Sequence, residues 1–153
     1  MGIIDPRALQ AAVKTWLQEN IPNDKELPGP NDDLTPEMED WIRAIRRDLG
    51  SRGWLAPRWP TYFGGGGFPP QAAAVIEQEM RQHRLPAFGI NMTFLVPLRV
   101  WGTEEQKQRW MTPTLRGEIT VCQIQSEPLT GSDLAYQATT AIKDGDEYVV
   151  NGE

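Results

Sequence analysis

Apolar residues recur at helical spacing through roughly the first three quarters of the chain and at alternate positions through the last quarter. The first apolar stripe follows Asp5-Pro6, a capping residue with proline at the first helical position. Residues three and four apart share one face of a helix, so this spacing predicts a helix that ends before Pro22. Its apolar face consists of Leu9, Val13, Trp16 and Leu17.

The same start signal recurs at Thr35-Pro36-Glu37, after a segment rich in Pro, Gly and Asp that extends to about Leu34. It predicts a second helix, which Gly50 and Gly53 end. The apolar face of this helix consists of Met38, Trp41, Ile42, Ile45 and Leu49.

Four consecutive glycines, residues 64–67, lie within the segment GWLAPRWPTYFGGGGFPP. The unhindered N–H groups of a glycine run can bind a phosphate. This run is not followed by the Lys-Ser/Thr of a phosphate loop, and no buried strand precedes it. We therefore predict a tight connection between helices, flanked by aromatic side chains.

Two more helices are marked by their first residues. Pro69-Pro70 opens a third helix, and Thr103 forms a capping box with Gln106, which predicts another helix from Glu104 to Gly117. The inner face of the third helix consists of Ala73, Ile76 and Met80.

Between them, the segment from about Pro86 to Trp101 is predicted as a helix that is apolar on nearly every side. Such a helix is expected to lie inside a bundle or to line something apolar. Pro97 is expected to bend or break it.

From Ile119 the period changes from helical to two. Residues 119–126 are predicted as a strand, and residues 136–152 as a hairpin that turns near Asp144-Gly145. One strand and one hairpin make too little sheet to be stable alone. These strands therefore either pair elsewhere or belong to a larger sheet.

Charge and composition exclude several classes of function. The net charge of −6 and the lack of a Lys/Arg run argue against nucleic acid as the main partner. The single cysteine, Cys122, excludes an internal disulfide and fits a reducing compartment. With no N-terminal targeting signal and no apolar stretch near ~20 residues, we expect a soluble cytoplasmic protein without membrane insertion.

Some residues that can carry chemistry are assigned to structure instead. His83 has no second ligand nearby, so no metal site is predicted. Cys122 has no histidine partner and is predicted as a small buried hydrophobe. The tryptophans on helical stripes, predicted as core, are Trp16, Trp41, Trp101 and Trp110.

Several separated motifs, in order and spacing, resemble those of the acyl-CoA dehydrogenase family. They are GTEEQKQRW at 102–110, GE at 117–118, CQ at 122–123, SEP at 126–128, GSDLA at 131–135 and DGDEYVVNG at 144–152, with GW at 53–54 and WP then GG at 59–65 resembling an earlier signature. The resemblance covers nearly the whole chain and is strongest from about residue 100. It implies an α+β multidomain protein: an N-terminal all-α helical bundle at 1–117, then the first strands of a β-barrel domain at 118–153. The C-terminal helical bundle of the relatives is absent from this sequence.

The resemblance also implies an FAD site. In the family, the segment that matches QIQSEP runs along the isoalloxazine ring, where Ser126 would hydrogen-bond the polar edge of the flavin. Gln123 and Gln125 could bring their amides to the same ring. A serine that merely begins a turn before Glu-Pro is the alternative interpretation.

The loop that follows would contact the acyl-CoA substrate. Gly131 and Ser132 match the family residues that contact the CoA part of the thioester, while Asp133 is interpreted as closing an Asx-turn. Relatives often have Gly-Ala where this sequence has Leu129-Thr130. The bulk of Leu129 indicates either a different path of the loop or an unusual substrate, and we favour a widened or rerouted entrance that serves a bulky or branched acyl group. A loop that turns the Leu129 side chain outward is the alternative.

The apolar fourth helix corresponds to the wall of the acyl-chain cavity in relatives. Its candidates for contact with the acyl chain are Met92, Phe94, Leu95 and Val96. Ordinary core packing accounts for these residues equally well, and periodicity does not separate the two interpretations.

The reaction implied is α,β-dehydrogenation of an acyl-CoA thioester, with hydride transfer to flavin N5, in fatty acid metabolism. The family's base is usually a glutamate in the C-terminal domain, so no catalytic residue is predicted in this chain and the chain alone is expected to be inactive. Expected partners are acyl-CoA, an electron-transfer flavoprotein or similar acceptor, and further subunits of a homo- or hetero-oligomer. A non-catalytic module of the same fold, an acyl-CoA oxidase and a flavin monooxygenase remain alternatives.

Overall fold

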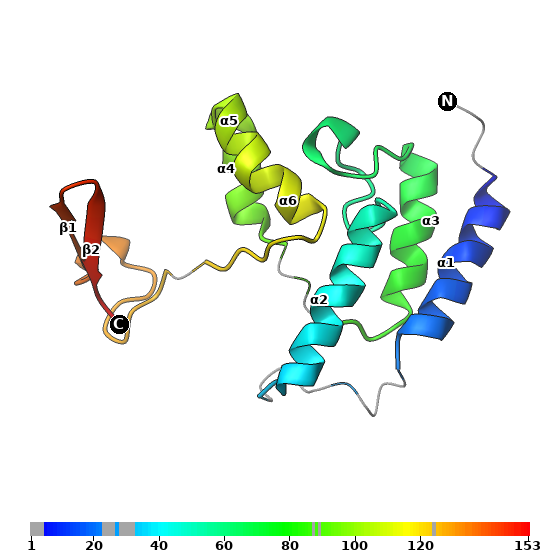
Figure 1. The fold of residues 1–153 in the computed structure, drawn as a ribbon, viewed down its shortest axis with the longest axis horizontal. Helices are drawn as coiled ribbons and strands as arrows, with labels where there is room; N and C mark the ends of the chain where they lie inside the picture. Colours follow the sequence, from blue (N-terminus) through cyan, green and yellow to red (C-terminus); the bar gives the residue numbers. More distant parts are fainter. Residues whose placement is uncertain (1–4, 23–26, 28–32, 87, 89, 124) are drawn as a thin grey trace. The chain divides into compact units, whose positions relative to one another are not determined.

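The structure is a computed structural model that describes residues 5–22, 27, 33–86, 88, 90–123 and 125–153. The chain divides into two compact units, Met1–Val121 (unit 1) and Cys122–Glu153 (unit 2). Unit 1 is helical, and unit 2 consists of a long loop followed by a β-hairpin (Figure 1). The predicted polar segment before Leu34 lies mostly outside the described residues.

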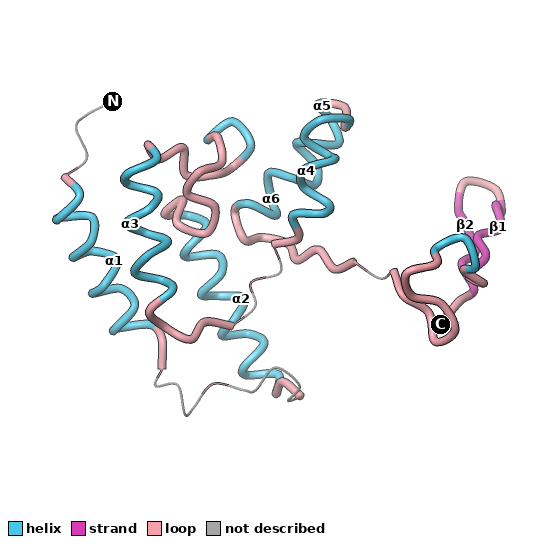
Figure 2. The backbone as a smooth tube through the Cα atoms, turned by 180° about the vertical axis from the view of Figure 1, so that it is seen from behind, coloured by secondary structure: helices cyan, strands magenta, loops and turns pink. Residues whose placement is uncertain are grey.

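Three helices form the first half of unit 1: α1 (Pro6–Asn20), α2 (Pro36–Ser51) and α3 (Pro70–Arg81) (Figure 2). Each begins with proline in its first turn, as the sequence predicted. The Asp5 side chain accepts a hydrogen bond from the Arg7 N–H at 3.0 Å, and the Thr35 hydroxyl accepts one from the Met38 N–H at 3.3 Å. These caps explain why local sequence located both starts correctly.

The three helices pack through one apolar cluster. The edge of the Trp16 ring meets the Trp54 ring with the centroids 6.3 Å apart, and the Trp16 indole N–H donates to Asp48 at 2.5 Å. The indole thus buries its apolar body while its one donor is satisfied. The buried members of the cluster are Val13, Trp16, Leu17, Ile45, Leu49, Trp54 and Ile76.

A buried carboxylate joins α1 to α3. Glu79 on α3 is only 1% exposed. Its carboxylate accepts a hydrogen bond from the Gln10 side chain at 2.6 Å and lies 3.9 Å from the Lys14 ammonium, both on α1. Since a buried charge is costly unless it is paired, these two contacts make Glu79 part of the helix interface.

A second helical group completes unit 1: α4 (Met92–Trp101), α5 (Glu104–Gln106), the π-helical turn η3 (Lys107–Met111) and α6 (Thr112–Leu115). The last three form one helical run, and the predicted capping box is present at its start. The π turn ends at Met111, two residues before Pro113, which lacks the N–H that an α-helical bond at this point would need. The buried cluster of this group consists of Ala56, Leu95, Met111 and Leu115.

The structure corrects the prediction for α4 at its start and excludes one of the two alternatives given for Pro97 and for the surroundings of the helix. The helix begins at Met92, where the Asn91 side chain accepts from the Thr93 N–H at 2.9 Å, and not near Pro86; residues 87 and 89 lie outside the described residues. Pro97 does not break the helix, which continues to Trp101, and a bend at Pro97 stays a prediction. The helix also does not lie inside the bundle, because Leu95 is its only fully buried described residue, and the alternative that it lines something apolar stays a prediction.

Two tryptophans and the cysteine differ from their predicted burial. Trp101 is 86% exposed and Trp110 is 42% exposed, so neither is a core residue, whereas Trp16 is buried as predicted. Cys122 is exposed. Helical spacing shows which residues share a face, but only packing shows which faces are covered.

The ends of α2 and α6 meet backbone to backbone. A Cβ on Gly50 would lie 2.0 Å from the Arg116 carbonyl oxygen, and a Cβ on Gly117 would lie 2.3 Å from the Arg46 carbonyl oxygen. The buried Arg46 side chain crosses the same contact and donates from Nε to the Gly117 carbonyl at 2.9 Å. Burial, together with nearby Arg47 and Arg43, lowers the pKa of the Arg46 guanidinium.

Unit 2 ends in the hairpin of β1 (Thr140–Asp144) and β2 (Glu147–Asn151), which confirms the predicted turn. The strands pair antiparallel from Thr140 opposite Asn151 to Asp144 opposite Glu147. Gly145 has φ +61° at the first turn position, where two-residue hairpins of type II′ favour glycine.

The predicted strand at 119–126 was wrong for its described residues, which form none; Ile124 lies outside the described part. In the described part of unit 2, the two strands pair only with each other. Alternating sequence alone does not make a strand without a neighbour to pair with.

We predict that replacing Glu79 by Ala lowers the free energy of unfolding by about 1–3 kcal/mol, because it removes the acceptor of the Gln10 amide from a buried site. Urea denaturation of the chain, followed by tryptophan fluorescence, measures this. Glu19→Ala on the exposed face of α1 is the control, with a change expected within ~0.5 kcal/mol. Equal effects of the two substitutions would contradict the assigned role of Glu79.

We predict that Gly50→Ala lowers the free energy of unfolding by about 1–3 kcal/mol, because the added methyl group would overlap the Arg116 carbonyl and force the helix ends apart. Gly131→Ala is the matched control, since a Cβ there would meet nothing within 4 Å. If Gly50→Ala were as stable as Gly131→Ala, the contact between α2 and α6 would be looser than described.

Candidate functional site

The predicted flavin-binding residues lie in the loop of unit 2. Gln125 and Ser126 line a cavity of about 460 Å³, whereas Gln123 does not line it. The Gln123 amide instead donates to the Gln125 side-chain oxygen at 2.6 Å. The other lining residues are Glu127, Gln137, Thr139, Val150, Gly152 and Glu153.

Ser126 is exposed, and its hydroxyl makes no hydrogen bond with the described residues. The hydroxyl is therefore free to donate to or accept from a ligand. Nearby in the loop, the Thr130 hydroxyl is buried without a hydrogen-bond partner among the described residues. An exposed and a buried hydroxyl, both without a protein partner among the described residues, are compatible with a segment that meets a polar ligand, and contact with a flavin stays a prediction.

The residues predicted to contact CoA lie in the same loop. Gly131 and Ser132 are both exposed, and the space around the Gly131 Cα is open. Leu129 is 95% exposed, so its side chain occupies no part of a cavity in unit 2. The extra bulk at this position is accommodated by the loop turning it outward.

The loop is closed at its base by a residue that the sequence analysis did not single out as a site residue. The two carboxylate oxygens of Glu127 accept hydrogen bonds from the backbone N–H groups of Ala138 at 2.7 Å and Thr139 at 2.9 Å. Hydrogen bonding from the Thr139 side chain and from these N–H groups lowers the pKa of Glu127. No sequence signal links a glutamate to amides more than ten residues later, so only the structure reveals this contact.

The acyl-chain candidates lie in unit 1. Leu95 is fully buried in the second cluster, and the half-buried Phe94 packs against that cluster. Met92 and Val96 are 48% and 47% exposed. Met92 also lines a cavity of about 420 Å³ together with Trp54, Trp59 and Ile90. Contact of these residues with an acyl chain stays a prediction.

The glycine run forms the predicted tight connection. The N–H groups of residues 64–67 donate to the backbone carbonyls of Thr61, Pro60, Ala56 and Trp59, in that order, at 2.8–3.1 Å. Because each N–H is already bonded, none is available to bind a phosphate. The rejection of a phosphate loop is therefore confirmed.

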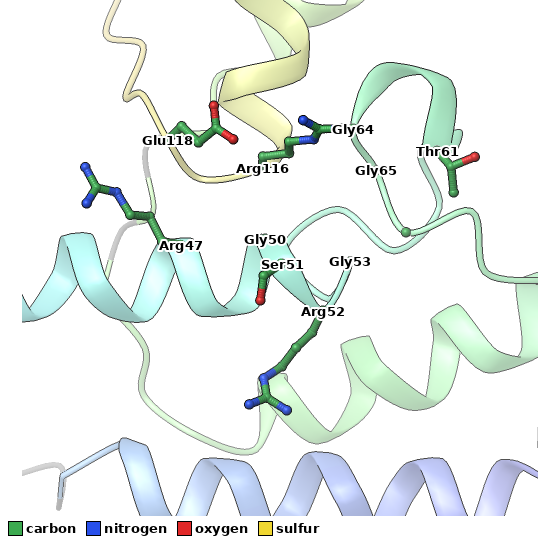
Figure 3. Close-up of a pocket in the computed structure, with 11 residues that line it drawn as sticks. Arg47, Gly50, Ser51, Arg52, Gly53, Thr61, Gly64, Gly65, Arg116 and Glu118 are labelled. Carbon is green, nitrogen blue, oxygen red and sulfur yellow. The ribbon is translucent and has the colours of Figure 1, made fainter.

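A cavity of about 610 Å³ beside this run is lined by three arginines, Arg47, Arg52 and Arg116, and by Glu118 (Figure 3). The arginine side chains point in different directions and not toward one point (Figure 3). Arg52 is also paired with Asp48 at 3.1 Å and lies over the Trp54 ring. The cavity thus lacks the convergent donors that define an anion site.

Two absences hold within the described residues. They contain no group of three or more His, Cys, Asp or Glu side chains placed to hold a metal ion. None of the described helices is both long and apolar enough to cross a membrane.

The helical unit, with the loop and hairpin that follow it, was compared with known protein families. The family model of the acyl-CoA dehydrogenase N-terminal domain matches residues 5–118. The chain belongs to the acyl-CoA dehydrogenase family. The predicted fold class, a helical region followed by the first strands of a β domain, is confirmed by the structure and by solved relatives.

Individual acyl-CoA dehydrogenases are also similar to this chain in sequence. Acyl-CoA dehydrogenase FadE29 of Mycobacterium tuberculosis is 33% identical over 150 residues, which is 97% of this chain and 38% of that protein. The human mitochondrial short-chain specific acyl-CoA dehydrogenase is 36% identical over 110 residues, 69% of this chain and 27% of that protein.

Solved structures show the same relationship. The steroid ACAD Tcur3481-Tcur3483 is 30% identical with a TM-score of 0.67, covering 99% of this chain and 40% of that chain. The ChsE4-ChsE5 complex of Mycobacterium tuberculosis is 28% identical with a TM-score of 0.63, covering 99% and 39%. The chain therefore spans at most two fifths of the length of these relatives.

Proposed function

We propose that this chain forms the N-terminal part of an FAD-dependent acyl-CoA dehydrogenase that carries out α,β-dehydrogenation of an acyl-CoA thioester. The observation that carries the proposal is family membership over residues 5–118, together with a loop that presents the free hydroxyl of Ser126. When bound, the flavin would supply the hydride acceptor. No residue of this chain is proposed as the catalytic base.

The roles proposed for the chain's own residues follow their chemistry. Ser126 would hydrogen-bond the polar edge of the flavin, with the amides of Gln123 and Gln125 nearby. Gly131 would let the backbone approach the CoA part of the thioester, and Ser132 would hydrogen-bond it. The acyl chain would meet residues of α4, for which the candidates are Met92, Phe94, Leu95 and Val96.

We further propose an oligomeric assembly and an electron-transfer flavoprotein or similar acceptor as partner. Two solved relatives, at 30% and 28% identity, carry paired names, Tcur3481-Tcur3483 and the ChsE4-ChsE5 complex. This supports a hetero-oligomer over a homo-oligomer for the assembled protein. Exposed apolar side chains on α4, among them Val100 at 63% and Trp101 at 86%, are available to such contacts.

For the substrate we propose a bulky acyl group. One relative is named as a steroid ACAD, and the departure from Gly-Ala at Leu129-Thr130 motivated the same idea from sequence. The outward orientation of Leu129 shows that the loop tolerates the extra bulk, so selectivity would depend on the path of the loop and not on contact with Leu129 itself.

We predict that Ser126→Ala weakens FAD binding about fivefold in the complete enzyme, because it removes one hydrogen bond worth ~1 kcal/mol. The hydroxyl makes no hydrogen bond with the described residues, so the substitution would remove only the proposed ligand contact. Flavin titration measures the change, with Asp133→Asn as the control that leaves flavin affinity intact. Unchanged affinity in the Ser126 variant would show that the loop does not meet the flavin.

We predict that replacing Leu129-Thr130 by Gly-Ala reduces kcat/KM for bulky acyl-CoA more than for straight-chain acyl-CoA, by about tenfold in the ratio, because the added glycine lets the loop take another path. Steady-state kinetics of both substrates in the complete enzyme test this. An equal effect on the two substrates would mean that these residues do not select the acyl group.

A further inference from the structure

One residue, Glu127, holds the loop of unit 2 at both of its ends, with its backbone at the start and its carboxylate at the end. Near its start, the Glu127 N–H donates to the Thr130 carbonyl at 2.8 Å, and the Thr130 N–H donates back to the Glu127 carbonyl at 3.1 Å. At its end, the Glu127 side chain accepts from the consecutive amides of Ala138 and Thr139 at 2.7 and 2.9 Å. One residue thus closes the tight turn and the wider loop together.

The contact at the end of the loop leads directly into the hairpin. Thr139 immediately precedes β1, and a Cβ on Gly152, just after β2, would lie 2.1 Å from the Thr139 hydroxyl oxygen. The Glu127 carboxylate therefore fixes the loop to the base of the hairpin. Hydrogen bonds that involve an ionised carboxylate are stronger than neutral ones, which suits a contact between two otherwise exposed segments.

Little else restrains the part of the loop that carries the proposed ligand contacts. Between residues 131 and 137 every residue is exposed, and the hydrogen bonds described there are Tyr136 N–H to the Asp133 carbonyl and the Gln137 amide to the Gln125 carbonyl. Gly131 and Ser132 make no hydrogen bond with the described residues. Their positions depend on the closure that Glu127 provides.

We propose that Glu127 is a positioning residue, whose carboxylate sets the conformation in which the loop presents Ser126, Gly131 and Ser132 to their ligands. The proposal rests on the proposed function for the identity of those ligands, but not for the loop closure itself. Glu127 does not take part in proton or hydride transfer.

The charges around Glu127 make the closure sensitive to acid. Glu153 lines the same cavity and Asp133 lies in the loop, while no described Lys or Arg forms an ion pair with Glu127. The pKa of Glu127 is lowered from 4.5 by the hydrogen bonds it accepts. Because the pKa of Glu127 is lower in the folded state than in the unfolded state, its ionised carboxylate stabilises the closed loop fully above the unfolded-state pKa. This stabilisation is lost as pH falls through the folded-state pKa. The closure is therefore complete at neutral pH and opens as pH falls through the lowered pKa of Glu127.

Amide NMR of the 153-residue chain tests the closure without any ligand. In the unmodified chain, the amides of Ala138, Thr139, Gly131 and Ser132 are expected to shift together on acidification, with one apparent pKa below 4.5. In Glu127→Gln, hydrogen-exchange protection of Ala138 and Thr139 is expected to fall about fivefold or more, because one oxygen acceptor becomes an amide donor. Glu147→Gln in β2 makes the same charge change and is expected to leave these amides unaltered.

The positioning role would be overturned if the amide shifts of Gly131 and Ser132 followed a different pH dependence from those of Ala138 and Thr139, or did not change with pH at all. A carboxylate that only supports the hairpin would not alter the amide shifts of Gly131 and Ser132. The titration of the unmodified chain keeps this test valid even if the Glu127 variant does not fold.

The complete enzyme, loaded with flavin, supplies the second measurement. Glu127→Gln is expected to lower kcat/KM for acyl-CoA about fivefold and to flatten its acid limb, whereas Glu147→Gln keeps the unmodified profile. A Glu127→Gln profile identical to that of the unmodified protein would overturn the proposal. If the unmodified complete enzyme neither bound flavin nor oxidised acyl-CoA while the amides of the 153-residue chain shifted together, the proposed function would fail and the loop closure would stand.

Discussion

Backbone contact between the ends of α2 and α6 is the constraint on which unit 1 depends. The first apolar cluster includes residues of α2, and the second includes residues of α6, so this contact joins the two cores. It exists because Gly50 and Gly117 lack side chains where the backbones touch, and because Arg46 satisfies the Gly117 carbonyl at the same point. Larger residues would separate the helices and the clusters with them.

The glycine run obeys the same physical rule. Its N–H groups bond to carbonyls of the preceding turns, and a Cβ on Gly65 would lie 2.4 Å from the Trp59 backbone oxygen. Glycine is needed there so that the chain can pack against itself, and not so that it can approach a ligand. The family signature in this region is thus explained by packing, while the residues proposed to meet ligands lie in a loop with free polar groups.

Unit 2 combines a rigid contact with open surface. Glu127 and the hairpin turn provide order, yet all ten strand residues are exposed. A two-stranded sheet with both faces exposed gains little from burial, so its loop depends on specific hydrogen bonds. That dependence gives a single carboxylate influence over the whole loop.

The sequence by itself determined the features that local chemistry controls. Proline and capping side chains located the starts of α1, α2 and α3, and Asp144-Gly145 located the hairpin, because each signal acts within a few residues. Spaced motifs also identified the family. The tertiary structure alone decided which faces are covered: Trp101 is exposed although its helix is apolar, and residues 119–126 lack a strand partner among the described residues. It also decided the contacts of Glu127, because hydrogen bonds between residues 11 and 12 positions apart depend on how the chain returns and leave no pattern in the sequence.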